Sequence, residues 1–175
     1  MAKARAGAVT FKGNPLTVIG PEIKAGDKAP DFKLLAKDLS TVTLKESQGK
    51  VRLISVVPPL DTPVCDQQTR RFNEEAAKLP ANVEVLTVSC DLPFAQARFC
   101  GAANINRVKV LSDHKETAFG QAYGVLIKEL RLLARSVFVV DASDKVRYVE
   151  LVKEVTQHPN YDAALNAAKS AAKPK

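Results

Sequence analysis

Three short apolar runs, separated by helical stretches, constrain the fold of this chain more than any other feature of its sequence. The runs are VRLISVV (51–57), NVEVLTVSC (82–90) and VKVLSD (108–113). Each is rich in the β-branched residues that buried strands favour. Between the runs, apolar residues recur at helical spacing from Pro63 to about Lys78, and residues 93–100 are expected to form a short second helix. Strands that alternate with helices predict a mainly parallel sheet covered on both faces.

Paired strands are predicted near both ends of the chain. AVTFKGNPLTVIG (8–20) alternates apolar and polar residues around Gly13-Asn14, which indicates a hairpin. SVFVVDASDKVRYVEL (136–151) indicates a second, antiparallel hairpin that makes the sheet mixed. The remaining segments read as a loop with short strands (27–50), a helix ending in glycine (115–124) and a closing helix (161–172).

These elements predict one α/β domain over residues 1–175, of the thioredoxin type with an N-terminal β-hairpin extension. Residues 1–7 and 169–175 are expected to be flexible tails. These tails also carry five of the seven net positive charges, which leaves residues 8–164 nearly balanced. A basic surplus placed on tails favours solubility, so we expect no nucleic-acid binding.

The expected compartment is the cytoplasm. The apolar runs are too short to span a bilayer, and the N-terminus lacks the apolar stretch of a signal peptide. Cytoplasmic cysteines are normally reduced, so a functional disulfide there would be transient and catalytic.

Cys65 lies on the first turn of a predicted helix, within PPLDTPVC (58–65). Thr62 is a candidate N-cap and Pro63 a candidate first helical residue. Free amide N–H groups and the positive end of the helix dipole would favour a thiolate at this place. The alternative is a structural cysteine that packs well, and the residues alone leave both interpretations open.

Cys100 lies at the expected end of the short helix 93–100, beside Gly101, which makes local unwinding cheap. Asp91 is a candidate N-cap of that helix. A thiolate with a second cysteine in reach is typical of a redox thiol, where sulfenic acid condenses to a disulfide. We expect neither a metal nor a cofactor, since C-x-x-C is absent and His114 and His158 are the two imidazoles.

The chain resembles the peroxiredoxins, and within them the bacterial thiol peroxidases of the atypical two-cysteine branch. PPLDTPVC contains their P-x-x-x-T-x-x-C pattern, and further segments match from about residue 8 to residue 168. The matching segments are SCDLPFAQARFCGA, LSDH and AYGVLIKELRLLARSVFVVD. The resemblance implies a peroxidase for hydrogen peroxide and alkyl hydroperoxides, reduced by thioredoxin and forming a homodimer near the active-site loops.

The resemblance also implies residue roles. Cys65 would be the peroxidatic cysteine, and Cys100 would resolve it through an intrachain disulfide. Thr62 would hydrogen-bond the thiolate and the peroxide, and Pro58 would shield the site from water. Arg135 would be the active-site cation, whereas the residues alone suggest a solvated arginine at a strand edge.

Two departures from the family pattern are Pro59, where relatives commonly have serine, and Cys90, where they commonly have alanine. Cys90 is expected to pack as a small hydrophobe, with a role as a second resolving thiol as the alternative. Asp61, Arg70, Arg71 and His114 are interpreted as capping or solvated residues. A non-enzymatic redox sensor on the same scaffold remains the rival function, while a dithiol–disulfide oxidoreductase would need C-x-x-C.

Overall fold

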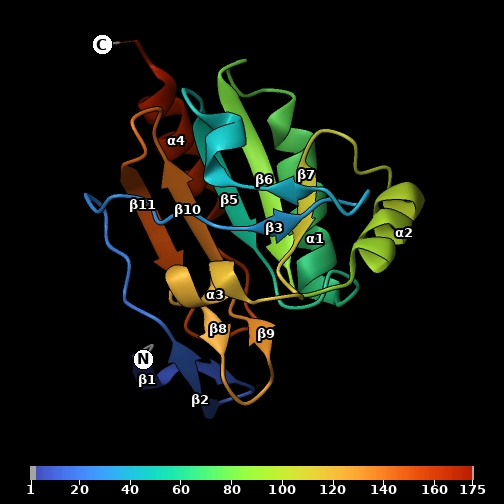
Figure 1. The fold of residues 1–175 in the computed structure, drawn as a ribbon, viewed down its shortest axis with the longest axis vertical. Coiled ribbons are helices and arrows are strands. Elements are labelled where there is room, and N and C mark those ends of the chain that lie inside the picture. Colours follow the sequence, from blue (N-terminus) through green and yellow to red (C-terminus); the bar gives the residue numbers. More distant parts are fainter. Residues whose placement is uncertain (1–2, 175) are drawn as a thin grey trace.

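A seven-stranded mixed sheet forms the centre of the fold in the computed structural model, which describes residues 3–174 (Figure 1). The strand order is β11-β10-β5-β6-β7-β3-β4. The strands β5, β6 and β7 are parallel, as predicted, and the others pair antiparallel. Their bounds are Leu34–Leu35 (β3), Thr41–Val42 (β4), Val51–Val56 (β5), Val83–Ser89 (β6), Lys109–Ser112 (β7), Ser136–Val140 (β10) and Val146–Leu151 (β11).

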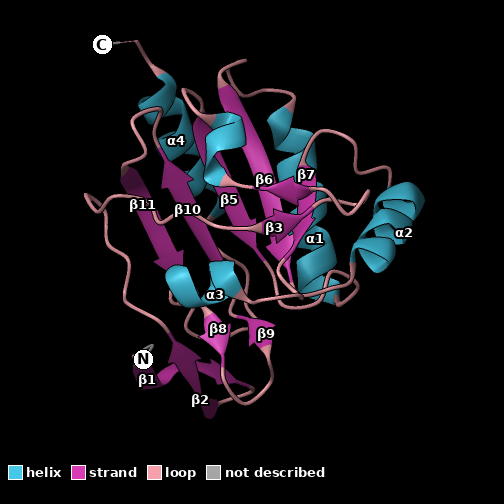
Figure 2. Ribbon diagram, viewed as in Figure 1, coloured by secondary structure: helices cyan, strands magenta, loops and turns pink. Residues whose placement is uncertain are grey.

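Helices cover both faces of this sheet (Figure 2). On one face lie α1 (Pro63–Ala76) and α4 (Tyr161–Ala172), and on the other lie α3 (Ala118–Ala122) and the 3₁₀ helix η1 (Leu44–Ser47). β5 alternates between the two cores: Val51 and Leu53 pack beneath α1 and α4, whereas Ile54 and Val56 pack toward α3. Among residues 3–174, no helix is long and apolar enough to cross a membrane.

The helix α2 (Pro93–Ala103) lies at the edge of the molecule, beside β7 (Figure 1). The sequence placed its end at Gly101, but the helix continues to Ala103. Asn104 ends it in the left-handed conformation, with φ of 55°. Glycine tolerates helical dihedrals as well as left-handed ones, so its presence did not fix the end. The N-cap residue is Leu92, not the predicted Asp91.

A second, four-stranded sheet lies below the first in Figure 1, in the order β1-β2-β8-β9. The predicted hairpin supplies β1 (Ala4–Phe11) and β2 (Asn14–Ile19). Its turn is Lys12-Gly13, with φ of 50° and 83°, one residue earlier than predicted. β8 (Leu126–Ile127) and β9 (Leu132–Leu133) were not predicted, because two-residue strands carry no periodicity.

Other boundaries differ from the sequence prediction at the ends of elements. The helix expected over residues 115–124 is the shorter α3, and η1 was missed within residues 27–50. Residues 4–7 belong to β1 and residues 169–172 to α4, so these parts of the expected tails lie in regular elements. Residues 1, 2 and 175 lie outside the described residues.

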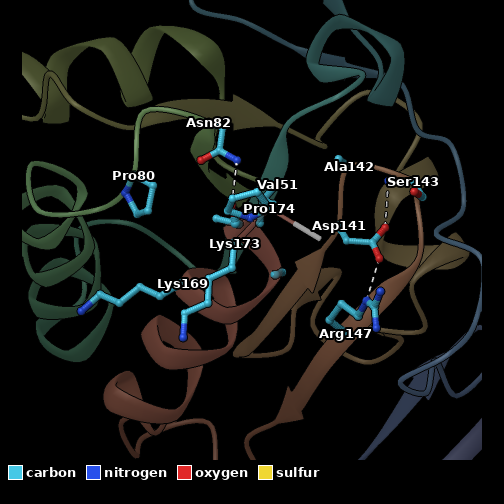
Figure 3. A pocket seen from close by; sticks show the side chains of 12 residues that line it. Val51, Pro80, Asn82, Asp141, Ala142, Ser143, Arg147, Lys169, Lys173 and Pro174 are labelled. Carbon is cyan, nitrogen blue, oxygen red and sulfur yellow. Dashed lines mark hydrogen bonds and ion pairs between the residues drawn. The ribbon is translucent and has the colours of Figure 1, made fainter.

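The cavity in Figure 3, of about 720 Å³, lies where β5 begins. Its lining includes Val51, Asp141 from the turn between β10 and β11, and Lys169 and Lys173 near the end of α4. Arg147 donates to Asp141 there, at 2.6 Å. Cys65 follows the opposite, carboxyl end of β5, where parallel α/β sheets bind their ligands, so this cavity is remote from the predicted chemistry.

Candidate active site

The loop between β5 and α1 positions Cys65. Thr62 is the N-cap residue of α1, with extended dihedrals of −89° and 153°, and Pro63 follows at the first helical position. The Thr62 hydroxyl donates to the carbonyl of Pro59 at 3.0 Å instead of capping the helix. Cys65 therefore lies on the first turn of a helix whose positive dipole end faces it, and its side chain is fully buried.

Arg135 contacts Cys65 directly, although seventy residues separate them in the sequence. Its Nη2 donates to the Cys65 sulfur at 3.3 Å, and its Nε donates to the carbonyl of Val155 at 2.9 Å. The guanidinium is 2% exposed, so it acts on the sulfur with little screening by water. A fixed cation that donates to the sulfur is placed to stabilise negative charge that develops there during a reaction.

Gln68 completes the support of this arginine, and sequence reasoning missed it. Its Oε1 accepts from Arg135 Nη1 at 3.0 Å, and its Nε2 donates to Ser55 Oγ on β5 at 2.8 Å. Gln68 follows Cys65 by three residues, so both side chains point to the same face of α1. This three-residue spacing from Cys65 was the signal in the sequence that could have identified Gln68 as a site residue. Arg135 is thus held by two contacts: Gln68 of α1, which is itself bonded to β5, and the carbonyl of Val155.

An apolar cavity of about 620 Å³ adjoins Arg135 and the loop before Cys65, although Cys65 itself does not line it. Pro58, Thr62 and Arg135 all contribute to its wall. The second sheet supplies apolar side chains to the same wall, namely Phe11 at the end of β1 and Ile127, Leu130 and Leu132 from the β8–β9 segment. The cavity therefore has room for a substrate that carries an apolar group next to its reacting atoms.

Cys100 lies on α2, opens into a different cavity of about 480 Å³, and is half-buried. Burial raises the pKa of its thiol, against a smaller opposing effect of Lys37. Cys65, Cys90 and Cys100 are all free thiols in this structure. The two predicted redox cysteines thus lie on separate helices and are not bonded to each other in this structure.

Cys90 follows β6 and packs against the main hydrophobic core. Burial raises the pKa of its thiol to about 12, and the nearby carboxylates of Asp113 and Asp91 add to the effect. A thiol with so high a pKa is a poor nucleophile at neutral pH. These surroundings favour the interpretation of Cys90 as a small packing residue. The solvated interpretation of Asp61, Arg70 and His114 agrees with their exposed side chains.

Asp113, which neighbours Cys90, gives a testable pH dependence. Its carboxylate accepts from the amides of Phe119 and Gly120 at 3.0 and 2.8 Å, and burial raises its pKa from 3.8 to about 6. The folded chain therefore binds this proton more tightly than the unfolded chain. Its contribution to stability is complete below about pH 4 and is lost as the pH rises through about 6.

We expect the wild type to lose on the order of 2 kcal/mol of unfolding free energy between pH 4 and 7, relative to Asp113→Asn. Denaturant unfolding of both proteins across this pH range measures the difference. A difference that does not change with pH would contradict the raised pKa.

The chain is similar to known proteins over most of its length. A family model described as Redoxin matches residues 24–165. A thiol peroxidase from Halalkalibacterium halodurans is 64% identical over 164 residues, which cover 94% of this chain and 98% of the relative. A thiol peroxidase from Bacillus subtilis is 59% identical over 165 residues, with the same coverage of 94% and 98%.

Solved structures show the same fold. A peroxiredoxin-like protein from Aquifex aeolicus superposes with a TM-score of 0.89 at 46% identity, covering 95% of this chain and 98% of that one. A thiol peroxidase from Chromobacterium violaceum superposes with a TM-score of 0.82 over 93% of this chain and 95% of its own. At 20% identity, this second likeness supports the fold alone.

Proposed function

This chain belongs to the Redoxin family and reduces peroxides by thiol chemistry, and we propose that Cys65 is the thiol that attacks the peroxide. The observation that carries the proposal is the buried contact between Arg135 Nη2 and the Cys65 sulfur at 3.3 Å, beside an apolar cavity. A non-enzymatic redox sensor is not favoured, because the similar chains are peroxidases over nearly their whole length.

In the first step, the Cys65 thiolate attacks one oxygen of the hydroperoxide and the O–O bond breaks. The departing oxygen takes a proton and leaves as water or an alcohol, and Cys65 becomes a sulfenic acid. Negative charge develops on both oxygens, and Arg135 is already oriented toward it by Gln68 and Val155. The Thr62 hydroxyl donates its one hydrogen to Pro59, so in this arrangement it does not donate to the thiolate as the resemblance implied, and its oxygen would instead accept the O–H of the substrate.

In the second step, the Cys100 sulfur attacks the sulfenic sulfur, a disulfide forms within the chain, and water leaves. A dithiol reductant of the thioredoxin type then returns both cysteines to thiols by disulfide exchange. Pro58, which is buried at the cavity wall, limits access of water to the site. The cytoplasm is the proposed compartment, and a second copy of this chain is the proposed partner, packed near the active-site loops.

The test of this function is an NADPH-coupled assay with thioredoxin and thioredoxin reductase, run with hydrogen peroxide and with an alkyl hydroperoxide. We expect turnover with both substrates, since the cavity accommodates an apolar group. Oxidation of NADPH no faster than without the protein, for both peroxides, would contradict the peroxidase function.

Cys100→Ser is expected to reduce one equivalent of peroxide, to stall as sulfenic acid and to lose thioredoxin-supported turnover. The reason is that the sulfenic acid has lost the thiol with which it condenses. The oxidised wild type should run as a single chain on a non-reducing denaturing gel. A disulfide-linked dimer as the main oxidised product would show that resolution occurs between subunits.

A further inference from the structure

Asp91 makes contacts that neither the sequence nor the proposed mechanism explains. The sequence suggested a helix cap, but its Oδ2 accepts from the backbone amide of Leu60 at 2.9 Å and from Ser89 Oγ at 2.7 Å. Its backbone carbonyl accepts from Ser112 Oγ at 2.5 Å. Asp91 is therefore fixed to the ends of β6 and β7, and from there it holds the loop that precedes Cys65.

The hydrogen bond from the Leu60 amide to Asp91 joins the two segments that carry the predicted redox cysteines. Leu60 is 2% exposed and packs with Val57 and Cys65 in a small apolar cluster. Phe99, the neighbour of Cys100 on α2, packs against the same cluster. The loop before Cys65 and the segment that leads through α2 are thus held together by one polar contact through Asp91 and one apolar contact through Phe99.

The second half of α2, which carries Cys100, is lightly held. Pro93 and Gln96 anchor the first half, because both are buried and Gln96 Nε2 donates to Ser89 Oγ at 3.0 Å and to the carbonyl of Leu111 at 2.8 Å. Residues 97–103 include no buried residue. Beyond the helix, Asn73 of α1 accepts from the amides of Asn106 and Arg107 at 3.2 and 2.8 Å, which anchors the chain after α2. In Figure 1, α2 projects from the edge of the molecule. Segments with few buried residues, such as residues 97–103, open at low free-energy cost.

We propose that Asp91 is a positioning residue whose carboxylate holds the Cys65 loop closed, and that release of the Asp91–Leu60 hydrogen bond admits Cys100. The closed form reduces peroxide, and the open form makes the disulfide, which requires the sulfurs about 2.05 Å apart. This inference rests on the proposed roles of Cys65 and Cys100.

Loss of the Asp91–Leu60 hydrogen bond should affect peroxide reduction and disulfide formation to different extents. A hydrogen bond from an amide to a carboxylate shifts a two-state balance by about tenfold. Because the closed form is the predominant one, losing the bond changes the closed fraction little and multiplies the open fraction. Disulfide formation should therefore respond much more strongly than peroxide reduction.

The experiment mixes each reduced protein with one equivalent of hydrogen peroxide and follows the thiol, sulfenic and disulfide forms by quenching and mass spectrometry. Asp91→Ala should form the disulfide about tenfold faster, with Cys65 oxidation slowed by less than about twofold. Asp91→Asn keeps an acceptor oxygen for Leu60 and should return the disulfide rate close to wild type. In the control Glu46→Ala, the lost carboxylate also binds one amide and one hydroxyl, both of Thr43, and both rates should stay unchanged.

An unchanged disulfide rate in Asp91→Ala, or an equal slowing of both steps, would overturn the proposal. Hydrogen exchange of the wild type gives a readout that does not depend on a variant folding. The Leu60 amide should be protected in the reduced protein and exchange faster in the disulfide form, and equal protection in both forms would also overturn it. A wild type whose cysteines peroxide does not oxidise would instead refute the proposed function.

Discussion

Cys65→Ser is expected to reduce peroxide consumption to the background rate. A serine hydroxyl keeps the size and position of the side chain but is not ionised at neutral pH, even beside Arg135. It also cannot form a sulfenic acid, so the first step does not occur and the second step lacks its reactant. Loss of peroxide, measured directly with reduced protein and no recycling system, reports on this step alone.

Cys90→Ser is the matched control, because it makes the same chemical change at a partly buried cysteine of raised pKa. It should consume peroxide at nearly the wild-type rate. If Cys90→Ser were inactive while Cys65→Ser remained active, the assignment of the nucleophile would be wrong.

Arg135→Ala is expected to slow the oxidation of Cys65 by a factor of about 10² or more. In the proposed mechanism, the guanidinium stabilises the thiolate before the reaction and the departing oxygen during it. It is preorganised by the bonds to Val155 and Gln68, so its removal leaves no other cation that contacts the Cys65 sulfur among residues 3–174. Competition with a second peroxidase for limiting peroxide measures the rate constant.

Removing a buried arginine also affects folding, and Arg52 provides the control for that effect. It is fully buried on β5, donates to the carbonyl of Asp141 at 3.1 Å and pairs with Asp144, remote from Cys65. Arg52→Ala should lower the unfolding temperature while the folded protein keeps its oxidation rate. A folded Arg135→Ala protein with wild-type reactivity would refute the role of Arg135.

The core of the fold could be predicted because its strands are fully buried. β5 and β6 appear in the sequence as nearly continuous β-branched runs, and their predicted and observed bounds agree closely. The part of the cavity wall that the second sheet supplies could not be predicted in the same way. β8 forms because β2 offers it a partner for backbone hydrogen bonds, and β9 pairs with β8; two residues each are too few to show a period.

Features of the site that depend on neighbouring residues could be predicted from the sequence, whereas those that depend on distant residues could not. The helix start at Thr62 and Pro63 is local, so the placement of Cys65 on the first turn followed from the sequence. The contact of Arg135 with Cys65 is long-range, and the family resemblance alone suggested it. Asp91 satisfied a local capping rule, but a tertiary hydrogen bond to Leu60 takes its carboxylate instead.

Trapping of the sulfenic acid tests the central claim most directly. The reduced Cys100→Ser protein is treated with one equivalent of hydrogen peroxide in the presence of dimedone, which reacts with sulfenic acids, and the labelled peptide is identified by mass spectrometry. Labelling should occur at Cys65, in near-stoichiometric amount, with Cys90 unlabelled. Labelling at Cys90, or peroxide loss without any label at Cys65, would contradict the account.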